Sequence, residues 1–115
     1  MLFRSVRFAL ALQSGKLLKP ATLQLLQTDQ PLSSGQPSGQ TLGWDLETPT
    51  IAGRPTPVIG LEGDVLGGPT ASLWTFPELH LTIALASNIS YADTFTLATR
   101  IARAFAESQP SPARN

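Results

Sequence analysis

The sequence predicts one small α+β domain, an antiparallel sheet with N-terminal helices and a C-terminal helix packed on it. Two segments show the helical spacing of apolar residues, residues 3–14 near the start and residues 93–107 near the end. Between them, residues 79–87 alternate between large apolar side chains and small or polar ones, as strands do. With 115 residues, of which 42% are hydrophobic, the chain is suited to one core.

The composition excludes several classes of function. The chain has no cysteine, which rules out disulfides, thiol catalysis and cysteine-ligated zinc or iron–sulfur clusters. Its formal net charge is zero, which argues against a nucleic-acid partner. No apolar run approaches the ~20 residues of a membrane span. We therefore expect neither a nucleic-acid complex nor a membrane-spanning segment.

The charges are unevenly distributed along the chain. Residues 1–19 contain four basic residues and no acidic one, whereas residues 20–93 contain seven acidic residues and one arginine. Residues 1–14 therefore share their composition with mitochondrial presequences. The apolar stretch from Phe8 to Leu12 is shorter than the ~7–15 residues of a secretory signal. We interpret residues 1–14 as an ordinary helix of the fold.

Two helices and a loop occupy the first forty residues. The first helix spans residues 3–14, and the second begins at a proline, which suits a first helical turn, and spans about residues 20–28. The second helix is expected to bury Leu23 and Leu26, with Leu25 as a further candidate. Residues 29–40 are rich in proline, serine and glycine, which is typical of a loop.

Four strands are expected to follow. They span residues 41–47, 58–61, 70–76 and 79–87, and the last two form a hairpin around the turn Pro77-Glu78. In the first strand, Leu42, Trp44 and Leu46 should share one face. In the last strand, small side chains, Ala84 and Ala86, lie on the face opposite the leucines.

The C-terminal helix is predicted over residues 93–107, with Asp93 as its N-cap. Its apolar stripe consists of Phe95, Ala98, Ile101, Ala102 and Phe105. We expect this stripe to pack on the face of Ala84 and Ala86, because small side chains allow a close approach. The domain then covers residues 1–108, and residues 109–115 form a flexible tail.

Four short segments occur in an order that is known from one family. They are the turn Gly15-Lys16-Leu17-Leu18, the strand Leu42-Gly43-Trp44, the glycine-rich stretch 60–68, and Leu73 to Glu78 followed by an apolar strand ending at Ser87-Asn88. Their order resembles the C-terminal part of the serine β-lactamase-like and penicillin-binding-protein-like hydrolases. These include class C β-lactamases, DD-peptidases, related esterases and the LACTB-like branch. The resemblance covers about residues 6–107 and implies a partial β-lactamase/DD-peptidase fold.

The resemblance implies acyl transfer through a serine ester. The family's nucleophile box, Ser-x-x-Lys, has no match, because Gln13 and Lys16 stand three residues before the two lysines. Its second box, Tyr-x-Asn, is also without a match, because the only tyrosine, Tyr91, is followed by Ala92 and Asp93. We therefore expect no catalytic residue in this chain.

The third box of the family, His/Lys-Thr-Gly, corresponds by position to Leu61-Glu62-Gly63, the expected substrate-binding residues. Gly63 is retained and would let a substrate backbone approach closely. Leu61 replaces the basic residue and can neither ionise nor form side-chain hydrogen bonds. A register shifted by one residue would put Glu62 at that position instead. Glu62 and Asp64 are expected to add negative charge where an anion would otherwise bind.

The resulting expectation is a fragment of a serine hydrolase that is inactive alone. Its substrate, a β-lactam, a D-amino peptide or an ester, remains open. Its partner would be the missing N-terminal part of the same domain or a second copy, since one sheet edge and an apolar face would otherwise be exposed. The alternatives are a non-catalytic binding or assembly module on the same half-fold and an unrelated interaction domain. Relatives are exported or mitochondrial, which leaves the compartment open.

The remaining candidate residues are assigned to ordinary roles. Four acidic residues lack a spacing that requires a metal ion: Asp45, Glu47, Glu62 and Asp64. The glycine-rich stretch lacks the Gly-Lys-Ser/Thr of a phosphate-binding loop, and no cofactor is expected. His80, beside a turn, is interpreted as a solvated surface residue. Trp44 and Trp74 are expected in the core or in a pocket wall.

Overall fold

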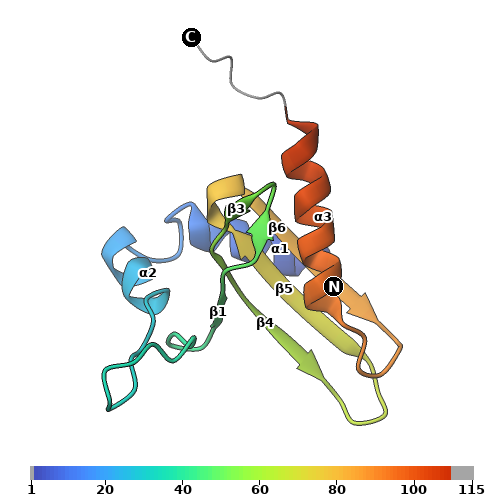
Figure 1. The fold of residues 1–115 in the computed structure, drawn as a ribbon, viewed down its shortest axis with the longest axis horizontal. Coiled ribbons are helices and arrows are strands. Elements are labelled where there is room, and N and C mark those ends of the chain that lie inside the picture. The colour runs from blue at the N-terminus through green and yellow to red at the C-terminus, as the bar shows by residue number, and fades with distance from the viewer. Residues whose placement is uncertain (1, 110–115) are drawn as a thin grey trace.

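The computed structural model describes residues 2–109 and has the α+β architecture expected from the sequence (Figure 1). Within that range the elements are α1 (Leu2–Gln13), α2 (Pro20–Leu26), β1 (Asp45–Glu47), β2 (Thr50–Ile51), β3 (Arg54–Pro55), β4 (Val58–Asp64), β5 (Thr70–Phe76), the 3₁₀ turn η1 (Pro77–Leu79), β6 (Leu81–Ser87) and α3 (Thr94–Ser108). Apart from Gln109, the tail predicted over residues 109–115 lies outside the described residues.

The main sheet has the strand order β1-β4-β5-β6, and its neighbouring strands are antiparallel. In the central register, Gly60 of β4 lies opposite Trp74 of β5, which lies opposite Ile83 of β6. In Figure 1, α3 crosses the near side of this sheet and α1 lies behind it. The fold therefore has three layers, with α3 and α1 on opposite faces of one sheet.

The core lies between the sheet and α3. Its buried members come from the strands and the helix: Ile51, Val58, Trp74, Phe76, Ile83, Ala98 and Ala102. The Trp74 and Phe95 rings meet edge to face, with centroids 4.7 Å apart and planes inclined by 62°. Such aromatic pairs add roughly 0.5–1.5 kcal/mol beyond the area that they bury. The aromatic contact therefore ties the first turn of α3 to the centre of the sheet.

The predicted placement of the C-terminal helix on the sheet is wrong. α3 packs on the face that carries Trp74, not on the face of Ala84 and Ala86. The small side chains that permit a close approach belong to the helix itself, because Ala98 and Ala102 are both 0% exposed. Large side chains on the sheet thus face small ones on the helix, which fills the interface without overlap.

The opposite face of the sheet is partly covered by α1. Ala9 and Leu12 are its buried residues, and its contacts are mainly with β6. Towards the end of the helix, Leu10 adjoins Thr75 and Thr82 at the η1 end of the sheet. The sheet face that carries Ala84 was expected to receive the C-terminal helix. In the structure it is covered by the N-terminal helix α1 instead.

The predicted strand over residues 41–47 is shorter in the structure, where β1 begins at Asp45. The preceding residues form a tight turn in which the Thr41 N–H donates to the Trp44 carbonyl at 2.8 Å. Gly43 stands in this turn with a φ of +101°, which side-chain-bearing residues rarely adopt. The glycine therefore ends the strand pattern that Leu42 and Trp44 suggested.

The β2–β3 hairpin was not predicted. Its two-residue turn consists of Ala52 and Gly53, both with positive φ, as the tightest hairpin turns require. The hairpin places Ile51, which is 2% exposed, in the core beside α3. Conversely, Phe105 was expected in the buried stripe and is 54% exposed.

The predicted second helix and the following loop are confirmed, with small differences. Leu23 and Leu26 of α2 are half-buried rather than buried. The loop over residues 29–40 is held by one carboxylate, since Asp29 accepts hydrogen bonds from the N–H groups of Ser38 and Gly39 at 3.2 and 2.7 Å. The proline- and glycine-rich loop is thus closed by a local side-chain contact.

The outer edge of the sheet is formed by β6, which has β5 as its only neighbour among the described strands. β6 has the sequence Leu-Thr-Ile-Ala-Leu-Ala-Ser, without a charged residue or a proline. Edge strands of natural proteins usually carry such residues, because these prevent pairing with other chains.

None of the described helices is long and apolar enough to cross a membrane.

Gly60 should be a stability-determining position. A Cβ there would overlap the Leu73 carbonyl oxygen and the Trp74 indole, whereas a Cβ at Gly63 would have nothing within 4 Å. We expect Gly60→Ala to lower the free energy of unfolding by roughly 1–3 kcal/mol, the usual cost of overpacking. Gly63→Ala is the matched control and should be close to neutral in the same urea titration. Equal effects of the two substitutions would contradict this packing.

Asp93 should give the stability of α3 a pH dependence. Its carboxylate accepts the Thr96 N–H at 2.9 Å, and hydrogen bonds from the Thr96 side chain and backbone lower the pKa of Asp93. A lowered pKa contributes stability above the unfolded-state pKa, of about 3.9, and loses it as pH falls through the folded-state pKa. The Asp93→Ala variant should therefore have a lower Tm than wild type at neutral pH, and the difference in Tm should disappear in acid. A difference that stays constant down to strongly acidic pH would refute this account.

Candidate functional site

The expected substrate-binding residues lie in the middle of β4, and the strand directs them to two different faces. Leu61 pairs with Leu73, and Gly63 pairs with Ala71, on the face that also receives α1. Glu62 pairs with Ser72 and lies on the opposite face, towards α3. This separation follows from the two-residue period of a strand. The structure therefore brings Leu61 and Gly63 together and removes the Glu62 side chain from them.

A shallow apolar hollow of about 390 Å³ lies over Leu61 and Gly63, beside the first turns of α1. Its lining side chains and backbone come from α1 and all three long strands: Leu2, Ser5, Leu61, Glu62, Gly63, Ala71, Ser72, Leu73, Leu85 and Ala86. Leu61 is 47% exposed there. Ligand clefts of proteins generally occupy roughly 300–1,000 Å³ and are mostly apolar. The hollow therefore has the size and the lining of a binding site for an uncharged group.

Glu62 has a structural partner. Its carboxylate accepts a hydrogen bond from the hydroxyl of Thr94, the first residue of α3, which is 3% exposed. The expectation that Glu62 and Asp64 add negative charge at the substrate position stays a prediction. Both residues alternate onto the α3 face of β4, and Glu62 also borders the hollow.

The edge of β4 is open beside this hollow. β1 pairs with β4 from Val58 to Gly60, and the described residues provide no strand partner for the segment from Leu61 to Asp64 on that side. An unpaired strand edge presents backbone N–H and C=O groups in the geometry that an extended chain recognises. The site therefore combines an apolar floor with a free hydrogen-bonding edge.

The polar side chains at the hollow do not form a nucleophilic pair. Ser5 and Ser72 are each followed three residues later by a residue other than lysine, namely Phe8 and Thr75. The Ser72 hydroxyl is buried on the α3 face and has no hydrogen-bond partner among residues 2–109. Within residues 2–109, no group of three His, Asp or Glu side chains is placed to hold a metal ion.

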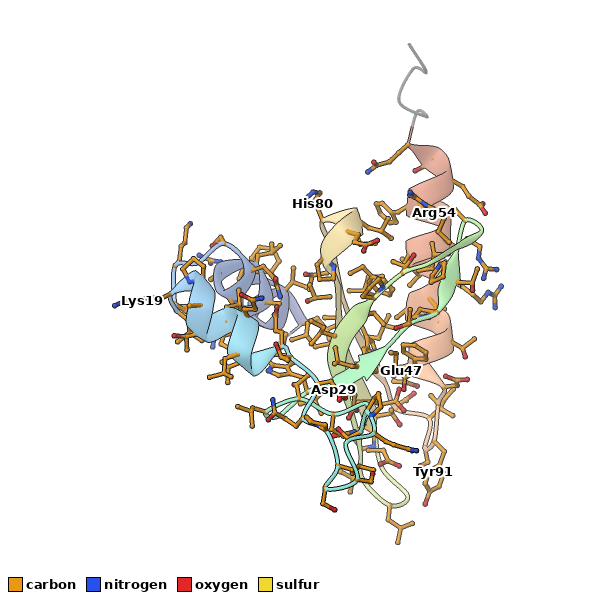
Figure 2. All side chains as sticks on the ribbon, turned by 60° about the vertical axis from the view of Figure 1, so that its left-hand side comes forward. Lys19, Asp29, Glu47, Arg54, His80 and Tyr91 are labelled. Atoms are coloured by element: carbon orange, nitrogen blue, oxygen red, sulfur yellow. The ribbon has the colours of Figure 1, made fainter. Side chains whose placement is uncertain are left out.

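The other residues weighed as candidates in the sequence lie away from the hollow. His80 is exposed at the end of η1, and Tyr91 is exposed at the opposite end of the sheet (Figure 2). Asp45 in β1 accepts a hydrogen bond from the Gln40 side chain. Trp74 is buried in the core, as the sequence suggested, whereas Trp44 is half-buried and belongs to neither the core cluster nor the lining of the hollow. The interpretation of His80 as a surface residue is confirmed.

Comparisons with family models, with curated proteins and with solved structures found no match to this chain.

Two residues of the site region were missed by sequence reasoning. Leu2 was not expected to line the hollow, because α1 and β4 are far apart in sequence. Thr94 was not expected as a partner of Glu62, because the two residues are 32 positions apart. Leu73 was accessible to prediction, since it alternates with Trp74 along a recognised strand and must face the other way.

The bond between Glu62 and Thr94 should contribute measurably to stability. Glu62→Ala leaves a buried hydroxyl without its partner, which typically costs roughly 1–3 kcal/mol. Asp64→Ala removes the next carboxylate on the same face, for which the described residues show no side-chain hydrogen bond, and serves as the control. Chemical denaturation should show a clear loss for the first variant and little change for the second. The reverse order would overturn the assignment of Glu62 as the partner of Thr94 in α3.

Proposed function

We propose that this chain is part of a serine hydrolase of the β-lactamase-like family, which acts by acyl transfer, and that it supplies the substrate-facing strand of the pocket. In this proposal β4 is the strand of the third box, and Leu61 and Gly63 face the substrate. The serine nucleophile and its lysine come from a segment outside these 115 residues. The chain alone is then without hydrolase activity.

One observation carries this proposal. Among the described strands, the one with the glycine-rich box pattern presents Leu61 and Gly63 in an apolar hollow beside its own unpaired edge. β4 lies between β1 and β5, but β1 pairs only with Val58 to Gly60, which leaves the edge beside Leu61 and Gly63 open. The helices and strands follow the order expected from the sequence segments, except that Leu42-Gly43-Trp44 forms a turn instead of a strand. Both features support a pocket wall rather than a closed core strand.

Leu61 decides what the pocket wall can do. A basic residue at this position would hold a carboxylate or take part in a proton network, whereas leucine offers only apolar contact. The substrate group opposite β4 is therefore uncharged. This favours an ester or another neutral acyl compound over a substrate with an anionic group at this position.

The direct test is to determine the coding sequence upstream of the Met1 codon. An in-frame Ser-x-x-Lys followed by Tyr-x-Asn supports the proposal, because these boxes would complete the acyl-transfer machinery. In-frame stop codons directly above Met1, in transcript and genomic DNA alike, would count against it. The result does not depend on how well the isolated chain folds.

Leu61→His should reveal the role of this position in a reconstituted enzyme. We expect no labelling of the wild-type chain by a fluorescent penicillin or a fluorophosphonate. When the chain is combined with its upstream segment, ester hydrolysis should appear. Leu61→His should then raise turnover of substrates that carry a carboxylate by about tenfold or more, since each 1.4 kcal/mol gained is tenfold.

The control for this experiment is Leu66→His. Leu66 is 87% exposed in the β4–β5 turn, outside the lining of the hollow. This substitution should leave the turnover of substrates with and without a carboxylate unchanged. A similar gain from Leu66→His, or covalent labelling of the isolated wild-type chain, would contradict the proposed role of β4.

The alternative is a non-catalytic binding or assembly module built on the same half-fold. It is favoured by the pairing of Glu62 with Thr94, which leaves the box without an ionisable side chain towards the hollow. This alternative predicts a start codon at Met1 and binding without turnover. Reconstituted ester hydrolysis would exclude it.

A further inference from the structure

The outer face of α1 combines exposed apolar and basic side chains. Ala9 and Leu12 point to the sheet, and because successive helical residues turn by about 100°, Phe3 and Arg7 lie on the opposite side, with Leu10 at its margin towards the η1 end of the sheet. Phe3 is 74% exposed and Leu10 is 50% exposed. Large apolar side chains at such exposure indicate a surface that meets something other than water.

The basic residues of this region are concentrated on the same side. Arg4 and Arg7 stand in the helix, Lys16 and Lys19 follow it, and all four are exposed. Figure 2 shows Lys19 directed away from the sheet at the end of the molecule that α1 and α2 form. The first acidic residue of the chain is Asp29. Residues 2–28 therefore form a positively charged segment that contains no acidic residue.

A shallow hollow joins the helix to the turn that follows it. It occupies about 580 Å³ and is lined by Arg7, Leu10, Ala11, Ser14 and Lys16. Two cations and a hydroxyl thus surround one concave surface. Leu17, directly after Lys16, is 52% exposed and extends the apolar part. We refer to the following residues together as the outer face of α1: Phe3, Arg4, Arg7, Leu10, Lys16, Leu17 and Lys19.

We propose that the outer face of α1 docks on an anionic lipid bilayer, with the helix lying in the plane of the membrane surface. Helices that bind in this way carry lysine and arginine together with aromatic and leucine side chains. The cations meet lipid phosphates, and Phe3 and Leu10 enter the boundary between headgroups and acyl chains. A nucleic acid would satisfy the cations but leave these apolar side chains in water.

The charge of the rest of the chain sets the orientation of the docked protein. The residues that follow, 20–93, contain seven acidic residues and one arginine. An anionic surface attracts the first segment and repels this one, so that α1 faces the lipid and the far side of the sheet faces water. Glu78, beside the Pro77 that adjoins Leu10, opposes the attraction with one charge. This docking does not depend on the proposed hydrolase function.

Flotation of the full chain with lipid vesicles tests the docking. Flotation separates vesicle-bound protein from aggregates, which remain at the bottom of the gradient. Binding is expected for vesicles of phosphatidylcholine with one third phosphatidylglycerol, and not for phosphatidylcholine alone. High salt should abolish it, because the Debye length falls from about 10 Å at 0.1 M to about 3 Å at 1 M.

Two variants separate the charged and apolar contributions. Arg4→Gln with Arg7→Gln should weaken binding about thirtyfold, because each basic residue near an anionic surface contributes about fivefold. Phe3→Ser should weaken it by about tenfold through the loss of apolar burial. Matched controls remove equal groups elsewhere, namely Arg54→Gln with Arg100→Gln for the charges and Leu66→Ser for the exposed apolar side chain. These controls should bind like wild type.

Three outcomes would overturn the proposal. The first is an absence of the chain from the floated anionic vesicles at low salt. The second is an equal loss of binding in the control variants, which would show an unspecific charge effect. The third is binding of a single-stranded oligonucleotide that is sensitive to Arg4 and Arg7, without vesicle binding, which would assign the surface to nucleic acid.

Discussion

The packing of the Trp74 indole across the backbone of Gly60 is the contact on which the rest of the fold depends. It holds β4 against β5 at the centre of the sheet and supplies the surface on which Phe95 and the first turn of α3 rest. The absence of a side chain at Gly60 is what admits the ring. The buried indole N–H has no hydrogen-bond partner among the described residues, so Trp74 acts here by its shape and apolar area.

The same contact determines what β4 can present to a ligand. The indole covers Gly60 on one face of the strand, whereas Leu61 and Gly63 lie on the other face, over the hollow, in the exposed half of β4. Glu62 is drawn to the α3 side and held by Thr94. Two adjacent residues of β4 thus have different roles, since Glu62 stabilises the fold on one face and Leu61 shapes the hollow on the other.

The sequence predicted the elements better than their contacts. Helical and alternating periodicities located α1, α2, α3 and the β5–β6 hairpin, because each pattern is local. The face that α3 covers was not predictable from β6 alone. A close approach of helix and sheet is allowed by small side chains on the helix, such as Ala98 and Ala102, as well as by small side chains on the strand. The strand pattern predicted only residues 58–61, whereas β4 continues to Asp64 and so includes Glu62 and Gly63. The partner of Glu62 lies 32 residues away and leaves no local signal.

The attachment of α1 has a consequence for the order in which the chain gains structure. The β4–β5–β6 meander and α3 join segments that are close in sequence, so that little loop-closure entropy opposes them. α1 instead meets β6 across most of the chain's length and buries only Ala9 and Leu12. We therefore expect α1 to dock after the sheet and α3 and to open before them, with amide protons that exchange sooner than those of the sheet. Each opening uncovers the face of Ala84 while the core under α3 stays closed, so the molecule behaves as a stable sheet with a detachable helix.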